Sequence, residues 1–132
     1  LLQGEFPLSD FKREIKGIKK AYKSASMLQL QNFGNPSNVP VFIVGMPRSG
    51  TTLIPDFIKS LQVHSVGESQ ELGFAARDAC AEAGIEHKAY ALPDLSRDLV
   101  RKYAQRYLNR VSFAAASAKR IVDKMPANFF QL

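Results

Sequence analysis

The feature that most constrains the fold is a short apolar segment that runs directly into a glycine-containing turn. Residues 39–44 (Val-Pro-Val-Phe-Ile-Val) are apolar, rich in β-branched side chains and without alternation, as in a strand buried on both faces of a parallel sheet. Pro40 suits the start of such a strand, because only interior positions need every N–H. After Gly45 and Gly50, apolar residues recur at helical spacing: Leu53, Phe57, Ile58 and Leu61. The sequence therefore predicts a strand, a loop and a helix, an arrangement that binds anions.

The rest of the chain adds strands and helices in alternation. Strands are predicted over residues 63–66 and 119–124, and a helix over 70–83 that ends before Gly84. Residues 94–116 predict the longest helix, with an apolar stripe at i, i+4 spacing: Leu95, Leu99, Tyr103, Tyr107 and Val111. Pro93 and Asp94 suit its start. The order is that of a βαβ sheet, so we predict a three-layer α/β fold with a central parallel sheet, truncated at its C-terminal side.

The first part of the chain predicts one basic amphipathic helix over residues 8–33. With a net charge of +6 and a pI of about 9.6, such a helix suits a membrane surface or a nucleic acid. A packed helix with a solvated basic face is the favoured interpretation. We therefore separate an N-terminal helical segment, 1–33, from the unit formed by 34–132, with a turn at 34–38 between them.

The composition excludes several classes of function. No apolar run approaches the roughly 18 residues of a membrane span, and no nucleic-acid motif is present. Cys80 is the only cysteine, so no internal disulfide is predicted. Its alanine neighbours indicate a buried helical position, in preference to a nucleophile paired with His64 or His87. One cysteine and two histidines make no zinc site, and we predict no metal.

The sequence also bears on localisation. No basic-then-apolar leader is visible, and the absence of a leader and of a disulfide pair favours the cytoplasm. The first residue is not methionine, so a leader before residue 1 stays open.

The loop at residues 45–52 has the chemistry of a phosphate site. Its glycines let backbone N–H groups approach phosphate oxygens, and Arg48 can hold two oxygens at once. The spacing Gly45-x4-Gly50 matches the ATP and GTP phosphate loop, but Thr51 replaces the lysine that reaches the β- and γ-phosphates. This difference argues against ordinary hydrolysis of a nucleoside triphosphate. A loop that merely joins a strand to a helix is the alternative.

Residues 41–53 (VFIVGMPRSGTTL) resemble the 5′-phosphosulfate loop of sulfotransferases. The likeness is closest to bacterial sulfotransferases that follow tetratricopeptide repeats and to the tyrosylprotein sulfotransferases. Residues 34–40 resemble the lead-in of the bacterial group. Two later patches fit as well, Val66-Gly67-Glu68 and the segment from Val122 to Phe129. By this resemblance, residues 34–132 form the N-terminal half of a sulfotransferase domain.

The resemblance implies a fold similar to P-loop kinases and 3′-phosphoadenosine 5′-phosphosulfate (PAPS) as the donor of a sulfuryl group. The residues that it implies for binding the phosphosulfate are Arg48, Ser49, Gly50, Thr51 and Thr52. It also implies that Arg48 stabilises transition-state charge, that Glu68 is the catalytic base and that Lys124 contacts the sulfuryl and bridging oxygens. The acceptor hydroxyl, on a peptide tyrosine, a carbohydrate or a small molecule, is left open.

Each of these roles has an alternative when the residues are taken without the family. Glu68 could be a solvated carboxylate, with Glu71 or His64 as the base, and Lys124 could pair with Asp123. Two other functions also remain. In a P-loop enzyme that uses nucleoside triphosphates, Asp123 would end a short Walker B strand and reach Mg²⁺. In a basic binding module, the helices would contact nucleic acid without catalysis.

Overall fold

The computed structural model describes residues 8–46, 50, 54, 63–88, 91–113, 115 and 118–130. Its elements follow in the order α1 (Leu8–Ala21), α2 (Ser24–Leu30), β1 (Pro40–Phe42), β2 (Val63–Gly67), α4 (Glu71–Glu82), η2 (Leu92–Asp94), α5 (Arg97–Phe113), β3 (Arg120–Asp123) and η3 (Pro126–Phe130). The predicted helix after the loop, around residues 53–61, lies outside the described residues apart from Ile54. None of the helices in the described part of the chain combines the length and apolarity that crossing a bilayer requires.

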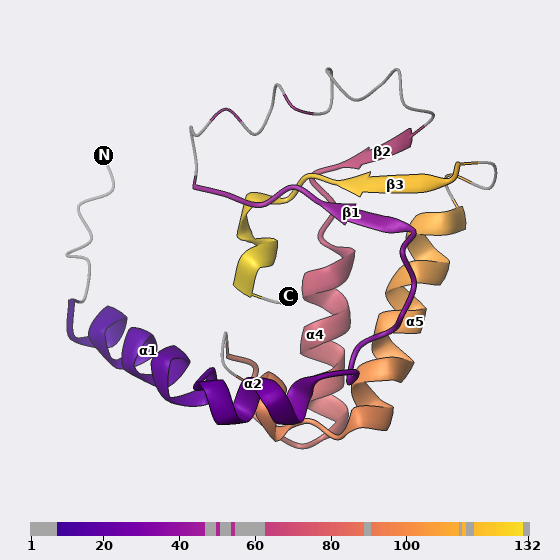
Figure 1. Cartoon of the computed structure of the whole chain (residues 1–132). Coiled ribbons are helices and arrows are strands. Elements are labelled where there is room, and N and C mark those ends of the chain that lie inside the picture. The colour runs from indigo at the N-terminus through magenta and orange to yellow at the C-terminus, as the bar shows by residue number, and fades with distance from the viewer. Residues whose placement is uncertain are drawn as a thin grey trace.

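The three strands form one parallel sheet in the order β1-β3-β2. The last strand in the sequence therefore lies between the first two, with Val122 opposite Val41 in β1 and opposite Ser65 in β2. In the central strand, Ile121 and Asp123 are at most 1% exposed. The helices α4 and α5 lie together against one face of the sheet (Figure 1). The predicted α/β fold with a central parallel sheet is confirmed.

The edge strand β1 differs from the prediction. It covers three residues instead of six, and Val41 and Val44 are 38% and 39% exposed, whereas Ile43 is 8% exposed. Burial on both faces, predicted from the apolar run, is therefore wrong for this strand. The physical reason is its position: among the described strands β1 has a neighbour only in β3, and the buried strand is β3, from Ile121 to Asp123.

The core lies between the sheet and the pair α4 and α5. Four residues of the predicted stripe are buried, Leu95 just before α5 and Tyr103, Tyr107 and Val111 within it. The fifth, Leu99, is partly buried and packs against them. On the outer side, basic residues of α5 form ion pairs with acidic residues of α4: Arg110 with Glu71 (2.7 Å), Arg106 with Asp78 (2.9 Å) and Lys102 with Glu82 (2.6 Å). The basic flank of α5 thus aligns the two helices as well as meeting solvent.

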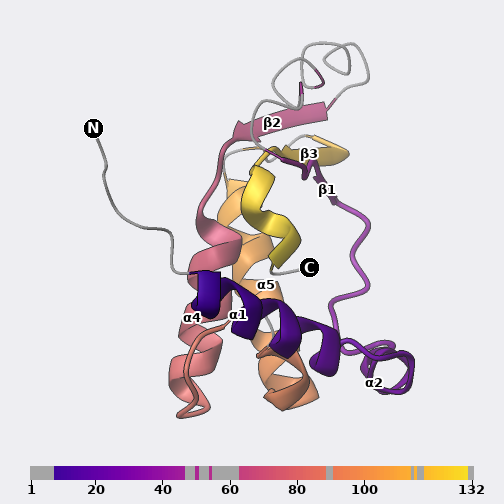
Figure 2. The ribbon, with the colours of Figure 1, turned by 90° about the vertical axis from the view of Figure 1, so that its left-hand side faces the viewer.

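Two predicted helix boundaries are corrected. The segment 8–33 is two helices, because the chain leaves the helical conformation at Lys23, whose ψ is 155°; Gly17 lies inside α1 and does not end it. Figure 1 shows α2 beside the ends of α4 and α5 that lie farthest from the sheet, and Figure 2 shows α1 crossing in front of the α4–α5 pair. The longest helix begins at Arg97, not at Asp94. Ser96 is its cap, since its hydroxyl accepts a hydrogen bond from the backbone N–H of Leu99 (3.3 Å).

A left-handed glycine ends α4 and gives a first prediction. Gly84 has φ +68°, and a Cβ at this position would meet nothing within 4 Å. Gly84→Ala therefore adds backbone strain without a clash, and we expect it to lower the free energy of unfolding by about 1 kcal/mol. Urea denaturation of the matched control Gly73→Ala should show the opposite sign, because Gly73 lies inside α4 with equally open space and alanine favours a helix interior. Equal effects of the two variants would contradict the argument.

Candidate functional site

The carboxyl ends of the three strands come together at the dipeptide Asp123-Lys124. The backbone carbonyl of Asp123 accepts a hydrogen bond from Ile43 N–H (3.0 Å), and Lys124 N–H donates to the carbonyl of Gly67 (2.9 Å). Gly45, the first residue of the phosphate-loop motif, donates to the carbonyl of Pro126 (3.4 Å). These bonds tie the end of β3 to the start of the loop on one side and to the end of β2 on the other. Open α/β sheets bind ligands at this edge.

Glu68 and Lys124, both predicted site residues, form an ion pair at this edge. Gly67, with φ +69°, ends β2 after a register shift and places Glu68 beside β3. The Lys124 side chain is only 10% exposed, whereas that of Glu68 is 57% exposed. The lysine is therefore held by the fold, and the carboxylate reaches it from the solvent side. The pair thus joins one largely buried and one mostly exposed charge at the edge of the sheet.

Asp123, the residue before Lys124, carries a fully buried carboxylate. Its Oδ2 accepts a hydrogen bond from the hydroxyl of Tyr107 (3.0 Å), and its side chain is 0% exposed. Its Oδ1 makes no hydrogen bond of ordinary length with the described residues, although the Asn128 side chain and the Ser69 N–H lie near enough to lower its pKa. Burial outweighs these contacts and raises the pKa of Asp123. Burial, followed by the adjacent Asp123 charge, raises the pKa of Tyr107 as well.

The phosphate-loop residues are placed only in part. Gly45 and Gly50 are described, and Gly50 has φ +85°, a conformation that favours glycine. The other residues predicted to bind the phosphosulfate lie outside the described residues: Arg48, Ser49, Thr51 and Thr52. Their roles remain predictions, and only the position of Gly45 at the carboxyl end of β1 bears on where the loop begins.

The alternatives to Glu68 and Lys124 occupy other surroundings. Glu71 is engaged by Arg110 on α5 (2.7 Å), and His64 lies within β2, opposite Ile121. Lys124 pairs with Glu68, not with Asp123. The Asp123 carboxylate is turned toward Tyr107 on α5, whose hydroxyl donates to it (3.0 Å).

Tyr107 makes a contact at the end of β3 that the sequence pattern did not predict. Its place in the apolar stripe predicted only a core residue, and it is indeed 3% exposed. The signal was its chemistry: a buried tyrosine hydroxyl requires a hydrogen-bond partner. Asp123, one residue before the predicted lysine, is that partner.

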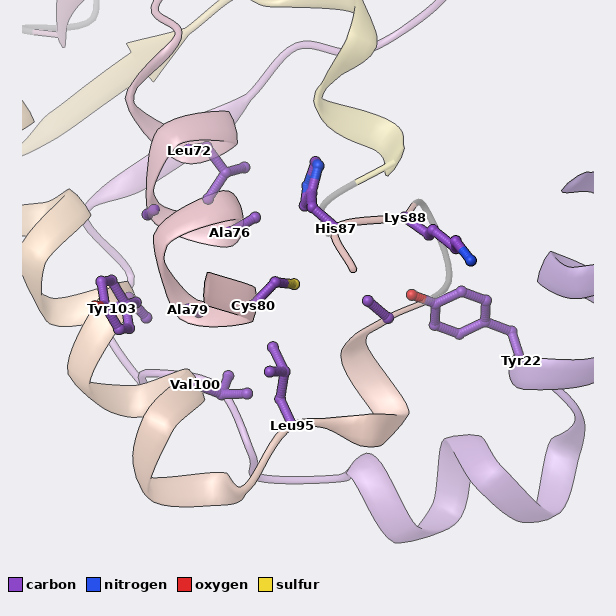
Figure 3. A pocket seen from close by; sticks show the side chains of 13 residues that line it. Tyr22, Leu72, Ala76, Ala79, Cys80, His87, Lys88, Leu95, Val100 and Tyr103 are labelled. Atoms are coloured by element: carbon purple, nitrogen blue, oxygen red, sulfur yellow. The ribbon is translucent and has the colours of Figure 1, made fainter. Parts of the chain in front are cut away.

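A separate apolar cavity of about 110 Å³ lies farther along α4 (Figure 3). Cys80 and His87 both line it, together with Tyr22 and Leu95. The thiol of Cys80 is 2% exposed, and burial raises its pKa. A thiol in these surroundings stays protonated and is a poor nucleophile, which agrees with the predicted role of Cys80 as a core residue.

Comparisons with known proteins bear on the family of this chain. No solved structure matches the chain. An uncharacterized protein of Aquifex aeolicus (strain VF5) is 38% identical to it over 110 residues, which is 76% of this chain and 14% of the relative. The chain therefore spans a small part of that relative's length. The sequence profile of the sulfotransferase family matches residues 40–132, which include β1, the loop, Glu68 and Lys124. This chain belongs to the sulfotransferase family.

Proposed function

We propose that this protein transfers a sulfuryl group from PAPS to an acceptor hydroxyl, with Glu68 as the base and Lys124 as the cation beside the transferred group. The observation that supports this most directly is the ion pair of these two residues at the carboxyl edge of the sheet, next to the strand end from which the phosphate loop starts. The family match gives the reaction type. The donor is taken from the resemblance of residues 41–53 to a phosphosulfate loop.

The reaction requires a base, a positioned sulfur and charge stabilisation. The acceptor hydroxyl gives its proton to the carboxylate of Glu68 while its oxygen bonds to sulfur. The bond from sulfur to the bridging oxygen breaks, and 3′,5′-bisphosphoadenosine leaves. Negative charge grows on the sulfuryl and bridging oxygens, where the ammonium group of Lys124 and the guanidinium of Arg48 stabilise it. The protein supplies positions and electrostatics, as in phosphoryl transfer.

Before the donor binds, Glu68 and Lys124 are each other's charged partner. With donor bound, the ammonium group of Lys124 has negatively charged oxygens to contact instead of Glu68. The carboxylate is then released from its ion pair and can accept the acceptor's proton. Because the lysine is largely buried and the carboxylate mostly exposed, Glu68 is the more mobile partner in this exchange.

Binding of the product 3′,5′-bisphosphoadenosine tests the proposal. At about a hundred times its dissociation constant, a ligand stabilises the folded protein by roughly 2.7 kcal/mol. We expect the full-length protein to show the corresponding thermal shift without Mg²⁺, and Arg48→Ala to lose it. The matched control is Arg97→Ala, which removes an exposed arginine at the start of α5 and should keep the shift.

Two results would overturn the proposed donor. One is a shift with ATP and Mg²⁺ but none with the bisphosphate, which would favour the P-loop enzyme that uses nucleoside triphosphates. The other is a bisphosphate shift that Arg48→Ala retains, which would place the nucleotide away from the loop. Affinity for nucleic acid that falls steeply with salt, together with no nucleotide binding, would favour the basic binding module.

A further inference from the structure

A groove of about 360 Å³ lies between the N-terminal half of α4 and η3. Gln70, Phe74 and Arg77 line it on the side of α4, and Met125 and Asn128 on the side of η3. Both elements run from the carboxyl edge of the sheet and lie on the same side of it (Figure 1, Figure 2). Gln70 is two residues after Glu68, and Met125 directly follows Lys124. The groove therefore lies near the ion pair at the carboxyl edge of the sheet.

The groove combines an apolar surface with a positive charge. The Phe74 ring is 36% exposed, and the Arg77 guanidinium lies 4.9 Å from its centre. No aspartate or glutamate is found among the described residues that line the groove. The acidic neighbours of Arg77 on α4, Glu71 and Asp78, are bound to arginines of α5. Within the described part of the chain, the charge of Arg77 is thus not neutralised by an ion pair.

We propose that this groove binds the acceptor and selects a small phenolic carboxylic acid, with its hydroxyl at Glu68 and its carboxylate at Arg77. The inference rests on the proposed sulfuryl transfer and adds the substrate class. The seven residue steps from Gln70 to Arg77 correspond to a rise of about 10 Å along the helix, so the two ends of the ligand are separated by an apolar stretch. A volume of 360 Å³ is within the usual range for small-molecule sites.

The lining also distinguishes this class from the other acceptors. A carbohydrate presents hydroxyl groups in many directions and requires many hydrogen-bonding side chains. Here the exposed lining is mainly apolar, from residues such as Phe74, Met125 and Ala127, and the hydrogen-bonding side chains are those of Gln70, Arg77, His87 and Asn128. A flat aromatic ring fits against the Phe74 ring, and the guanidinium of Arg77 suits a planar carboxylate, which it can bind through two N–H groups.

A matched pair of acceptors tests the inference in the full-length protein. The probes are 3-(4-hydroxyphenyl)propanoate and its methyl ester, which differ only in charge at the far end, and a neutral tripeptide with a central tyrosine. We expect kcat/KM to favour the acid over the ester by about five- to tenfold, as for one partly exposed charge-assisted contact. Arg77→Gln should reduce this ratio to near one, Arg77→Lys should restore part of it, and the control Arg97→Gln should leave it unchanged.

Binding separates a failure of the inference from a failure of the proposed function. Calorimetry should detect the acid, in the presence of 3′,5′-bisphosphoadenosine, in the wild type but more weakly in Arg77→Gln. The inference is overturned if the acid neither binds nor reacts, if the ratio of acid to ester is near one, if Arg77→Gln leaves the ratio intact, or if the neutral peptide is preferred. In each of these cases the protein can still bind 3′,5′-bisphosphoadenosine through Arg48. Only a failure to bind the bisphosphate would refute the donor assignment.

Discussion

Glu68→Gln is expected to lower kcat by about 10²- to 10⁴-fold, the usual contribution of a positioned general base. The amide has the size of the carboxylate and can still accept a hydrogen bond from Lys124, so the local structure should persist. It cannot take up the proton of the acceptor hydroxyl. Because the ion pair is largely exposed on the side of Glu68, the free energy of unfolding should change by less than about 1 kcal/mol. Steady-state kinetics of sulfate transfer would give kcat and KM separately.

The control for this prediction is Glu71→Gln. Glu71 lies three residues farther on, at the start of α4, and its carboxylate is bound to Arg110 (2.7 Å). Removing its charge costs an interhelical ion pair but no base, so the rate should change by no more than about fivefold, the equivalent of 1 kcal/mol. A large loss of kcat in Glu71→Gln, with Glu68→Gln near wild type, would exchange the two assignments.

The sequence predicted the order of the elements well, because that order depends on local patterns. The i, i+4 stripe on α5 and the glycine after α4 each have a direct physical consequence, in side-chain burial or in backbone conformation. The sequence-based prediction failed where the burial of a strand depends on which other strands pair with it. The apolar run at β1 does not say whether a strand is central or at an edge, and only the pairing with β3 settles that.

In the candidate site, too, local patterns predicted some features, whereas others depend on contacts between distant parts of the chain. The pairing of Glu68 with Lys124 joins residues that are 56 positions apart in the sequence, and no periodicity indicates it. It follows from the sheet order, which places the end of β2 beside the end of β3. The resemblance to a family selected both residues, but their contact depends on the register of the strands. Tyr107 was hidden for a related reason, since its stripe predicts burial but not the group that its hydroxyl meets.

Among the substitutions proposed here, we expect removal of the Tyr107 hydroxyl to lower the free energy of unfolding most. In Tyr107→Phe the buried Oδ2 of Asp123 loses its hydrogen-bond donor, which should cost about 1–3 kcal/mol at neutral pH, where the carboxyl group is more often charged. Urea denaturation at pH 7 measures this loss. The control is Tyr103→Phe: the Tyr103 hydroxyl bonds to Glu82 (2.8 Å), an exposed carboxylate that also pairs with Lys102, so its loss should cost less.

The pH dependence identifies the charge of Asp123 as the cause. Burial raises the pKa of this carboxyl in the folded state, so the folded protein binds its proton more tightly than the unfolded chain does. The stabilisation from this proton is complete below the ordinary aspartate pKa and is lost as the pH rises through the raised value. Tyr107→Phe removes a contact that lowers this pKa, so its cost should be larger at pH 7 than at pH 4. In an Asp123→Asn background, which has no charge to bury, the cost of Tyr107→Phe should be smaller and independent of pH in this range. The same cost at both pH values and in both backgrounds would mean that Tyr107 acts through packing alone, and that the buried carboxylate of Asp123 does not depend on its hydroxyl.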